Sequence, residues 1–111
     1  MIANLICAHL VGDFLLQNEE MQAKSKSAWV CTVHVSFYAL PFLFLVSSAG
    51  LSVWLLAAIL LQHWFQDRFA LHLRYMRFFG HTTPEKWPMG PLCVDQAMHI
   101  GFMWYLCLLC Y

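Results

Sequence analysis

Charged side chains are nearly missing from long parts of this sequence. Residues 27–66 contain no Asp, Glu, Lys or Arg, and residues 92–111 contain a single one, Asp95. Over the whole chain of 111 residues, 11% are charged and 61% are hydrophobic, against about 25% and roughly 45–50% in an ordinary soluble domain. Because about 20 apolar residues span a bilayer as a helix, this deficit indicates an integral membrane protein whose main partner is the lipid bilayer.

The features of several functional classes are also absent. The six basic residues are balanced by six acidic ones, and no basic run with interleaved aromatics points to a nucleic-acid partner. No Ser or Cys has a clear base partner, so the sequence does not indicate a nucleophilic side chain. Cys107 and Cys110 form a C-x-x-C near the end of the chain. It could be a redox pair or half of a metal site, but a second half is missing.

The apolar pattern predicts an all-α fold, an integral membrane four-helix bundle that occupies residues 1–111 as a single transmembrane domain. The expected helices cover residues of about 2–21, 27–47, 51–69 and 92–111. Residues 70–91 mix Phe, Trp and Tyr with Arg and Lys, which is typical of a segment lying at the membrane interface. His72 and His81 fall in this segment and are expected at the interface, with accessory metal ligation by His81 as the alternative.

The basic residues predict the orientation of the bundle. All six lie in, or directly beside, the first or the third connection between the expected helices: Lys24, Lys26, Arg68, Arg74, Arg77 and Lys86. With four spans these two connections fall on the same side of the membrane, and the positive-inside rule makes that side cytoplasmic. Both termini are then expected outside.

Polar residues recur at helical spacing inside the apolar segments. Every Asp of the chain stands four residues from a His, in the pairs His9/Asp13, His63/Asp67 and Asp95/His99. Residues four apart share a helix face. Together with His34 of the second helix, these residues all fall in the cytoplasmic half of the predicted bundle. We therefore expect a polar centre built by all four helices, which the small residues Gly12 and Gly101 would let approach closely.

A metal centre is the sharpest interpretation of this set. Imidazole and carboxylate donors suit Zn, Mn or Fe, and the candidate ligands are His9, Asp13, His34, His63, Asp67, Asp95 and His99. They exceed one tetrahedral shell, so either two ions share them or some of the acids orient ligating histidines. The neighbouring glutamines Gln17, Gln62, Gln66 and Gln96 are candidates for the same supporting role.

The corresponding function is a metal-dependent hydrolase acting on a lipid-like or headgroup ester. Metal-activated water would be the nucleophile, and Asp13, Asp67 or Asp95 would serve as general base. The alternative is a non-enzymatic membrane protein in which the same groups serve packing, partner binding, or an ion or proton pathway. Such a protein could be a homo-oligomer with a pore at its axis, although the outer half of the predicted bundle has almost no polar residues.

Four stretches carry a family resemblance: AHLVGDFLLQNEEMQAKSKS, VHVSFYALPF, LQHWFQDRF and VDQAMHI. They resemble a family of small bacterial and phage integral membrane proteins that is catalogued as a domain of unknown function. The resemblance spans nearly the whole chain and implies a helical protein of the bacterial inner membrane, often phage-borne. It implies no activity or cofactor. The positions that match the family's polar pattern are His9, Asp13, Gln17, His34, His63, Asp67, Asp95, Gln96 and His99.

Overall fold

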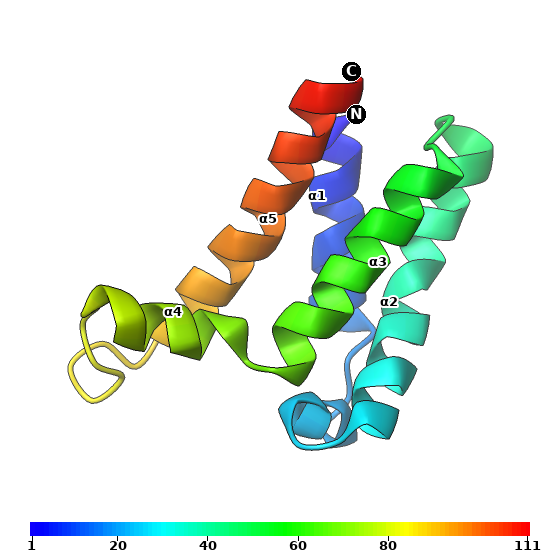
Figure 1. The fold of residues 1–111 in the computed structure, drawn as a ribbon. Coiled ribbons are helices and arrows are strands. Elements are labelled where there is room, and N and C mark those ends of the chain that lie inside the picture. The colour runs from blue at the N-terminus through cyan, green and yellow to red at the C-terminus, as the bar shows by residue number, and fades with distance from the viewer.

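The computed structural model describes all 111 residues and is entirely helical. Its elements in chain order are α1 (Ile2–Leu10), η1 (Val11–Leu15), η2 (Glu20–Ser25), α2 (Ala28–Ser48), α3 (Val53–Arg68), α4 (Leu71–Phe79) and α5 (Gly90–Cys110). Figure 1 shows both termini at one end of the molecule, together with the turn between α2 and α3. The η2 segment and α4 lie at the opposite end. The all-α prediction is thus confirmed, with five main helices.

The first helix is shorter than the sequence predicted. It ends in the π-helical turn η1 at Leu15, not near Met21, and Leu16 then leaves helical geometry with φ −101° and ψ 5°. The chain restarts as the separate 3-10 segment η2, where the Met21 N–H donates a hydrogen bond to the Asn18 side-chain oxygen at 2.9 Å. Asn, like Asp and Ser, forms such local bonds to the backbone in place of a continued helix.

The predicted interfacial segment contains a helix of its own. Left-handed residues bound α4 at both ends, Ala70 with φ 47° and Gly80 with φ 72°. Gly80 adopts this conformation at little cost, whereas Ala70 does so at about 1–2 kcal/mol. The break at Ala70 turns the chain sharply after α3, so that α4 extends sideways from the base of the bundle in Figure 1. The next helix, α5, begins two residues earlier than predicted, with Pro91 in its first turn, where a missing N–H costs nothing.

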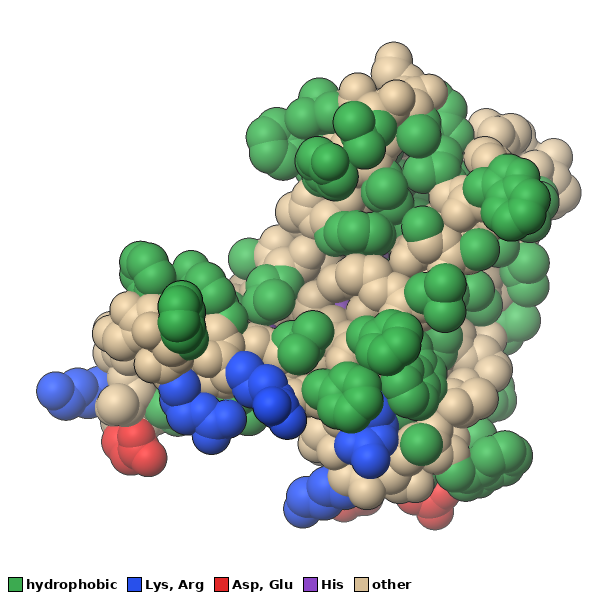
Figure 2. All heavy atoms as spheres, in the orientation of Figure 1, with side chains coloured by type: hydrophobic (Ala, Val, Ile, Leu, Met, Phe, Trp, Pro, Cys, Tyr) green, Lys and Arg blue, Asp and Glu red, His purple; other side chains and the backbone are tan.

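Much of the outer surface is apolar. Large hydrophobic side chains stand out from the helices, among them Trp54, Phe78 and Leu15 with exposed fractions of 85%, 92% and 77%. Figure 2 shows hydrophobic side chains spread along the visible face, and Lys and Arg gathered at the end that carries η2 and α4. By length and composition, α2 and α5 are the two helices able to cross a membrane. We predicted four full spans, and two of them are shorter than that. The Ile2–Leu15 segment is about 21 Å long at 1.5 Å per residue, and α3 has 16 residues.

An apolar cluster fills the bundle between the termini and its polar middle. Its buried members are Leu5, Ala8, Tyr38, Phe42, Leu51, Leu55, Leu56, Ile59 and Met103. Gly12 lets α2 approach the first helix closely here, because a Cβ at this position would lie 3.0 Å from the backbone oxygen of Tyr38. The same expectation for Gly101 is wrong: a Cβ there would meet no atom within 4 Å, and the residue is exposed.

Candidate metal centre

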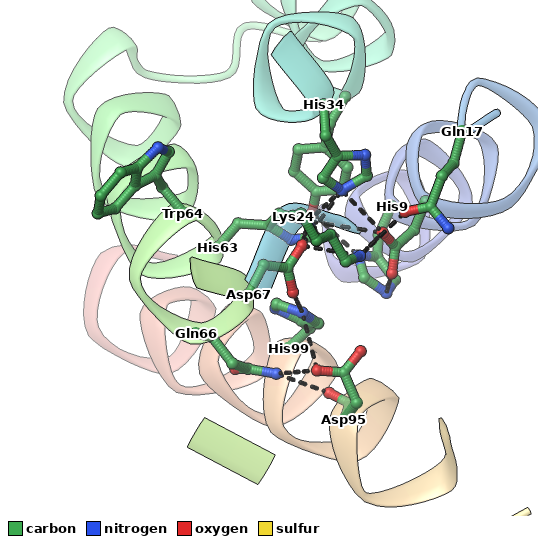
Figure 3. A network of polar contacts seen from close by, with 12 residues as sticks. His9, Gln17, Lys24, His34, His63, Trp64, Gln66, Asp67, Asp95 and His99 are labelled. Atoms are coloured by element: carbon green, nitrogen blue, oxygen red, sulfur yellow. Dashed lines mark hydrogen bonds and ion pairs between the residues drawn. The ribbon is translucent and has the colours of Figure 1, made fainter. Parts of the chain in front are cut away.

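Below the apolar cluster, all seven predicted ligand residues are buried in one place. Their exposed fractions range from 0% for His9, His34 and His63 to 8% for Asp95. The elements that contribute them are α1, η1, α2, α3 and α5. Figure 3 shows six of these side chains pointing toward one another from the separate helices: His9, His34, His63, Asp67, Asp95 and His99. Helical spacing places His63 and Asp67 on one face of α3, where the His63 Nε2 and an oxygen of Asp67 are 2.9 Å apart.

Four side chains direct one ligand atom each toward a common point. The His34 Nε2 lies 3.2 Å from both Asp13 Oδ1 and Asp67 Oδ2. The His63 Nε2 lies 3.5 Å and 2.9 Å from the same two oxygens, and the two Nε2 atoms are 3.0 Å apart. Bonds of about 2.0–2.2 Å to a tetrahedral ion place its ligand atoms roughly 3.3–3.6 Å from one another. The observed separations are close to this, and we call these four residues the four-donor site.

Ion pairs, and no hydrogen bonds, engage one oxygen of each carboxylate in the four-donor site. Asp13 Oδ1 and Asp67 Oδ2 are buried and, apart from ion pairs, have no hydrogen-bond partner. Buried polar atoms without partners are rare and costly. A divalent ion between the two oxygens and the two Nε2 atoms would satisfy all four, so the residues present fit a metal.

Ring stacking orients His63. The Nδ1 atoms of His34 and His63 have no partner. The His63 ring instead lies between the rings of Tyr38 and His99, with centroid distances of 3.8 Å and 4.1 Å. These contacts hold its Nε2 toward the carboxylates.

A second donor group adjoins the first through a shared carboxylate. Asp13, Asp95 and His99 also offer ligand atoms that lie within 4.8 Å of one another. The Gln66 amide donates to Asp95 Oδ1 at 2.8 Å and to the Asp95 backbone oxygen at 3.0 Å, which ties α5 to α3. Because Asp13 belongs to both groups, the arrangement can hold two ions with this carboxylate between them.

His9 differs from the other histidines of the centre in that neutral side chains accept or donate the hydrogen bonds of both its ring nitrogens. Its Nδ1 lies 2.9 Å from the Tyr38 hydroxyl and its Nε2 2.7 Å from Gln96 Oε1. It belongs to neither donor group. Gln96 in turn donates to Asp13 Oδ2 at 2.7 Å. His9 is therefore placed to orient Asp13 through Gln96 instead of binding an ion directly.

The four predicted glutamines all contact the centre. Gln66 and Gln96 bind its carboxylates, as described above. Gln62 lies 3.4 Å from His99 Nδ1, and Gln17 accepts a hydrogen bond from Lys24 at 3.0 Å. Amide side chains in this position fix the orientation of ligand groups without adding charge.

Lys24 enters the centre although the sequence assigned it to a cytoplasmic connection. Its Nζ lies 2.9 Å from Asp67 Oδ2 and 3.7 Å from Asp13 Oδ1. Burial lowers the pKa of the ammonium, but the carboxylates of Asp67 and Asp13 outweigh burial, and the net pKa is raised from its ordinary value. The sequence held no signal for this contact, because the irregular residues 16–19 and the 3-10 segment η2 have no simple periodicity.

His72 is a second addition. We expected it at the interface, but its Nδ1 lies 3.4 Å from Asp95 Oδ1 at the edge of the centre. Burial lowers the pKa of this imidazole, and the charge of Asp95 opposes that shift. The break at Ala70 is what turns the start of α4 back toward α5.

Two other predicted candidates lie away from the centre. His81 lines a cavity of about 550 Å³ with Arg77, Thr82 and Thr83, and none of the seven predicted ligands borders it. Cys107 and Cys110 are free thiols in the last turn of α5, at the end of the molecule opposite η2 and α4 (Figure 1). Accessory ligation by His81 therefore receives no support from the geometry.

Comparison with known proteins yields one match. A family model described as a protein of unknown function (DUF3307) matches residues 1–110. No curated protein and no solved structure matches the chain. The match supports the resemblance drawn from the polar positions.

Proposed function

The chain belongs to the DUF3307 family, and we propose that it is a membrane-bound, metal-dependent hydrolase of a lipid-like or headgroup ester. The observation that carries the proposal is the convergence of Asp13 Oδ1, His34 Nε2, His63 Nε2 and Asp67 Oδ2 in a buried site. Zn, Mn and Fe suit this mixture of imidazole and carboxylate donors. Packing alone does not require two imidazole nitrogens to face each other and the same two carboxylate oxygens.

The apolar surface supports a place in the membrane. Within the most apolar windows of α2 and α5, only 39% and 22% of residues are buried by the protein itself. The remaining apolar side chains would face water in a soluble monomer, at about 25 cal/mol for each Å². Lys and Arg at one end, and none at the other, support an inner-membrane orientation with η2 and α4 on the cytoplasmic side.

The residues of the centre divide the chemistry between them. A metal held by the four donors would need a further position for water, as zinc sites gain when they expand to five ligands, and would then lower the pKa of that water and polarise the ester oxygen. Hydrolysis forms a bond from the water oxygen to phosphorus or to the acyl carbon, and breaks the bond to the alcohol oxygen, which takes up the proton that water gives up. Asp95 is suited to accept the proton of water, since it lies between His99 and His72 at the least buried edge of the set.

The apolar cluster argues against an ion or proton pathway through one copy of the chain. Phe42, Ile59 and Met103 are at most 1% exposed and occupy the bundle between the polar centre and the termini. A pathway for ions needs polar groups or water along its length. The clustering of the polar groups in one buried region supports a site over a pathway.

Metal content is the direct test of this proposal. Protein purified in detergent should hold at least one equivalent of Zn, Mn or Fe by elemental analysis, because the four-donor site is complete without rearrangement. His63→Ala should reduce the content to background, whereas His81→Ala, outside the centre, should leave it unchanged. Protein that stays metal-free after incubation with each ion, and still unfolds on His63→Ala, would show that the cluster serves packing only.

Thiol labelling tests the proposed orientation. In a variant that keeps Cys110 as its one cysteine, a membrane-impermeant maleimide should label intact spheroplasts, because Cys110 is exposed at the end expected outside. In a cysteine-free variant that carries Ser25→Cys, on η2, labelling should require disruption of the membrane. The reverse pattern would place the centre at the outer face and contradict the proposed orientation.

A further inference from the structure

Lys24 and a bound metal would compete for the same two oxygens. The ammonium lies 2.9 Å from Asp67 Oδ2 and 3.7 Å from Asp13 Oδ1, which are the carboxylate ligands of the four-donor site. In the absence of a metal, this ammonium is the cation of the site. A dication at the four donors would neutralise both carboxylates, and Lys24 would lose the charges that balance it.

With both donor groups loaded, the centre therefore has positive charge in excess. With neutral histidines, Asp13, Asp67 and Asp95 carry three negative charges, against four positive charges on two dications and one on Lys24. A partly buried charge without a partner is costly, and a focused positive potential attracts anions. An anionic substrate would remove the excess charge, whereas a neutral carboxylic ester would not.

The backbone keeps Lys24 beside the centre after its carboxylates are neutralised. Arg68 Nη1 donates to the Ser25 backbone oxygen at 3.1 Å, and Met21 on the same 3-10 segment is buried with an exposed fraction of 5%. Gln17 Oε1 still accepts one ammonium hydrogen. The other two donors of the ammonium are then free for an oxyanion.

Lys24 also lies on the accessible side of the site. Its side chain is 18% exposed, against 3% for Asp13 and 1% for Asp67. A ligand that approaches the carboxylates from this side meets the ammonium first. We propose that the substrate is a phosphoester, whose phosphate oxygens are bound jointly by Lys24 and the metal. This inference rests on the proposed metal centre and narrows its substrate from an ester in general to a phosphoester.

Inorganic phosphate is the probe that tests this assignment. Isothermal titration calorimetry in detergent should show that the zinc-loaded protein binds phosphate at least tenfold more tightly than the metal-free protein. In the metal-free protein, the Lys24 ammonium is paired with Asp13 and Asp67. At saturating zinc, Lys24→Gln should weaken phosphate binding at least tenfold. Lys26→Gln, an exposed lysine two residues away, should leave it unchanged. Acetate should bind at least tenfold more weakly than phosphate.

Zinc titration separates this inference from the proposed function. Lys24→Gln should bind zinc at least tenfold more tightly than the natural protein, because the competing ammonium is gone. Zinc binding with no phosphate binding, or with equal phosphate affinity in Lys24→Gln, would overturn the inference and leave the metal centre standing. Failure of both proteins to bind any of Zn, Mn and Fe would overturn both. If Lys24→Gln does not fold, the natural protein with and without zinc decides the question by itself.

The source of the phosphate group follows from a second ligand. Tighter binding of a short-chain phosphatidic acid than of inorganic phosphate, at saturating zinc, would identify a lipid headgroup. Equal or weaker binding would identify a water-soluble phosphoester. Both results support a phosphate site, and they differ only in what carries the phosphate.

Discussion

Asp67→Asn is expected to abolish stoichiometric metal binding and to cause the largest loss of stability among single substitutions in the centre. One oxygen of Asp67 faces Lys24, His34 and His63 at 2.9–3.2 Å, and the other lies 3.3 Å from His99. The substitution keeps the shape of the side chain and removes its charge. Breaking a buried ion pair in this way costs about 3–5 kcal/mol. Loss of a residue that only orients a metal ligand lowers metal affinity roughly 10–100-fold. Loss of the ligand Asp67 itself should lower it by more.

Two measurements distinguish a lost ligand from a weakened fold. Zinc should raise the thermal unfolding midpoint of the natural protein, because a ligand that binds only the folded state stabilises it. Zinc should leave the midpoint of Asp67→Asn unchanged. Glu85→Gln, which removes an exposed carboxylate in the loop before α5, should behave like the natural protein. A zinc-dependent shift of equal size in Asp67→Asn would show that Asp67 is not a ligand.

Gly12→Ala is expected to separate α1 and η1 from α2 and to lower the free energy of unfolding by about 1–3 kcal/mol, as overpacking does elsewhere. The added Cβ would lie 2.6 Å from Tyr38 Cδ2, and 3.0 Å and 3.1 Å from the oxygen and Cα of the Tyr38 backbone. A side chain can rotate away, but the backbone of α2 cannot. Asp13 follows Gly12 directly, so its distance from His34 should increase and zinc affinity should fall as well.

Gly101→Ala is the matched control for this prediction. Its Cβ would meet no atom within 4 Å, and replacing Gly by Ala inside a helix contributes about 0.5–1 kcal/mol of stability. The two substitutions should therefore change the unfolding midpoint in opposite directions in a thermal denaturation of the detergent-solubilised protein. A destabilisation of similar size in both would mean that helix flexibility, and not the contact with Tyr38, determines the effect.

The composition and the helical spacing of the polar residues determined much of this protein. The stretches without charge predict helices, because helices satisfy their own backbone hydrogen bonds when no water is available. The spacing of four between His63 and Asp67, and between Asp95 and His99, already places each pair on one helix face. Helix ends were predicted less well, since the first helix ends at Leu15 in a π-turn, for which periodicity gives no signal.

Only the tertiary structure decided which polar groups meet. His9 has the residue type and the spacing of a ligand, but Tyr38 and Gln96 take both of its nitrogens. The sequence placed Lys24 in a connection between helices. It joins the centre because η2 folds back against α2 and α3, where Arg68 donates a hydrogen bond to the Ser25 backbone oxygen.

The physical reason is the range of each interaction. Hydrophobic periodicity and i to i+4 contacts act within one helix, so the sequence reveals them directly. Contacts between helices depend on the turns at Leu16 and Ala70, whose directions arise only when the whole chain packs.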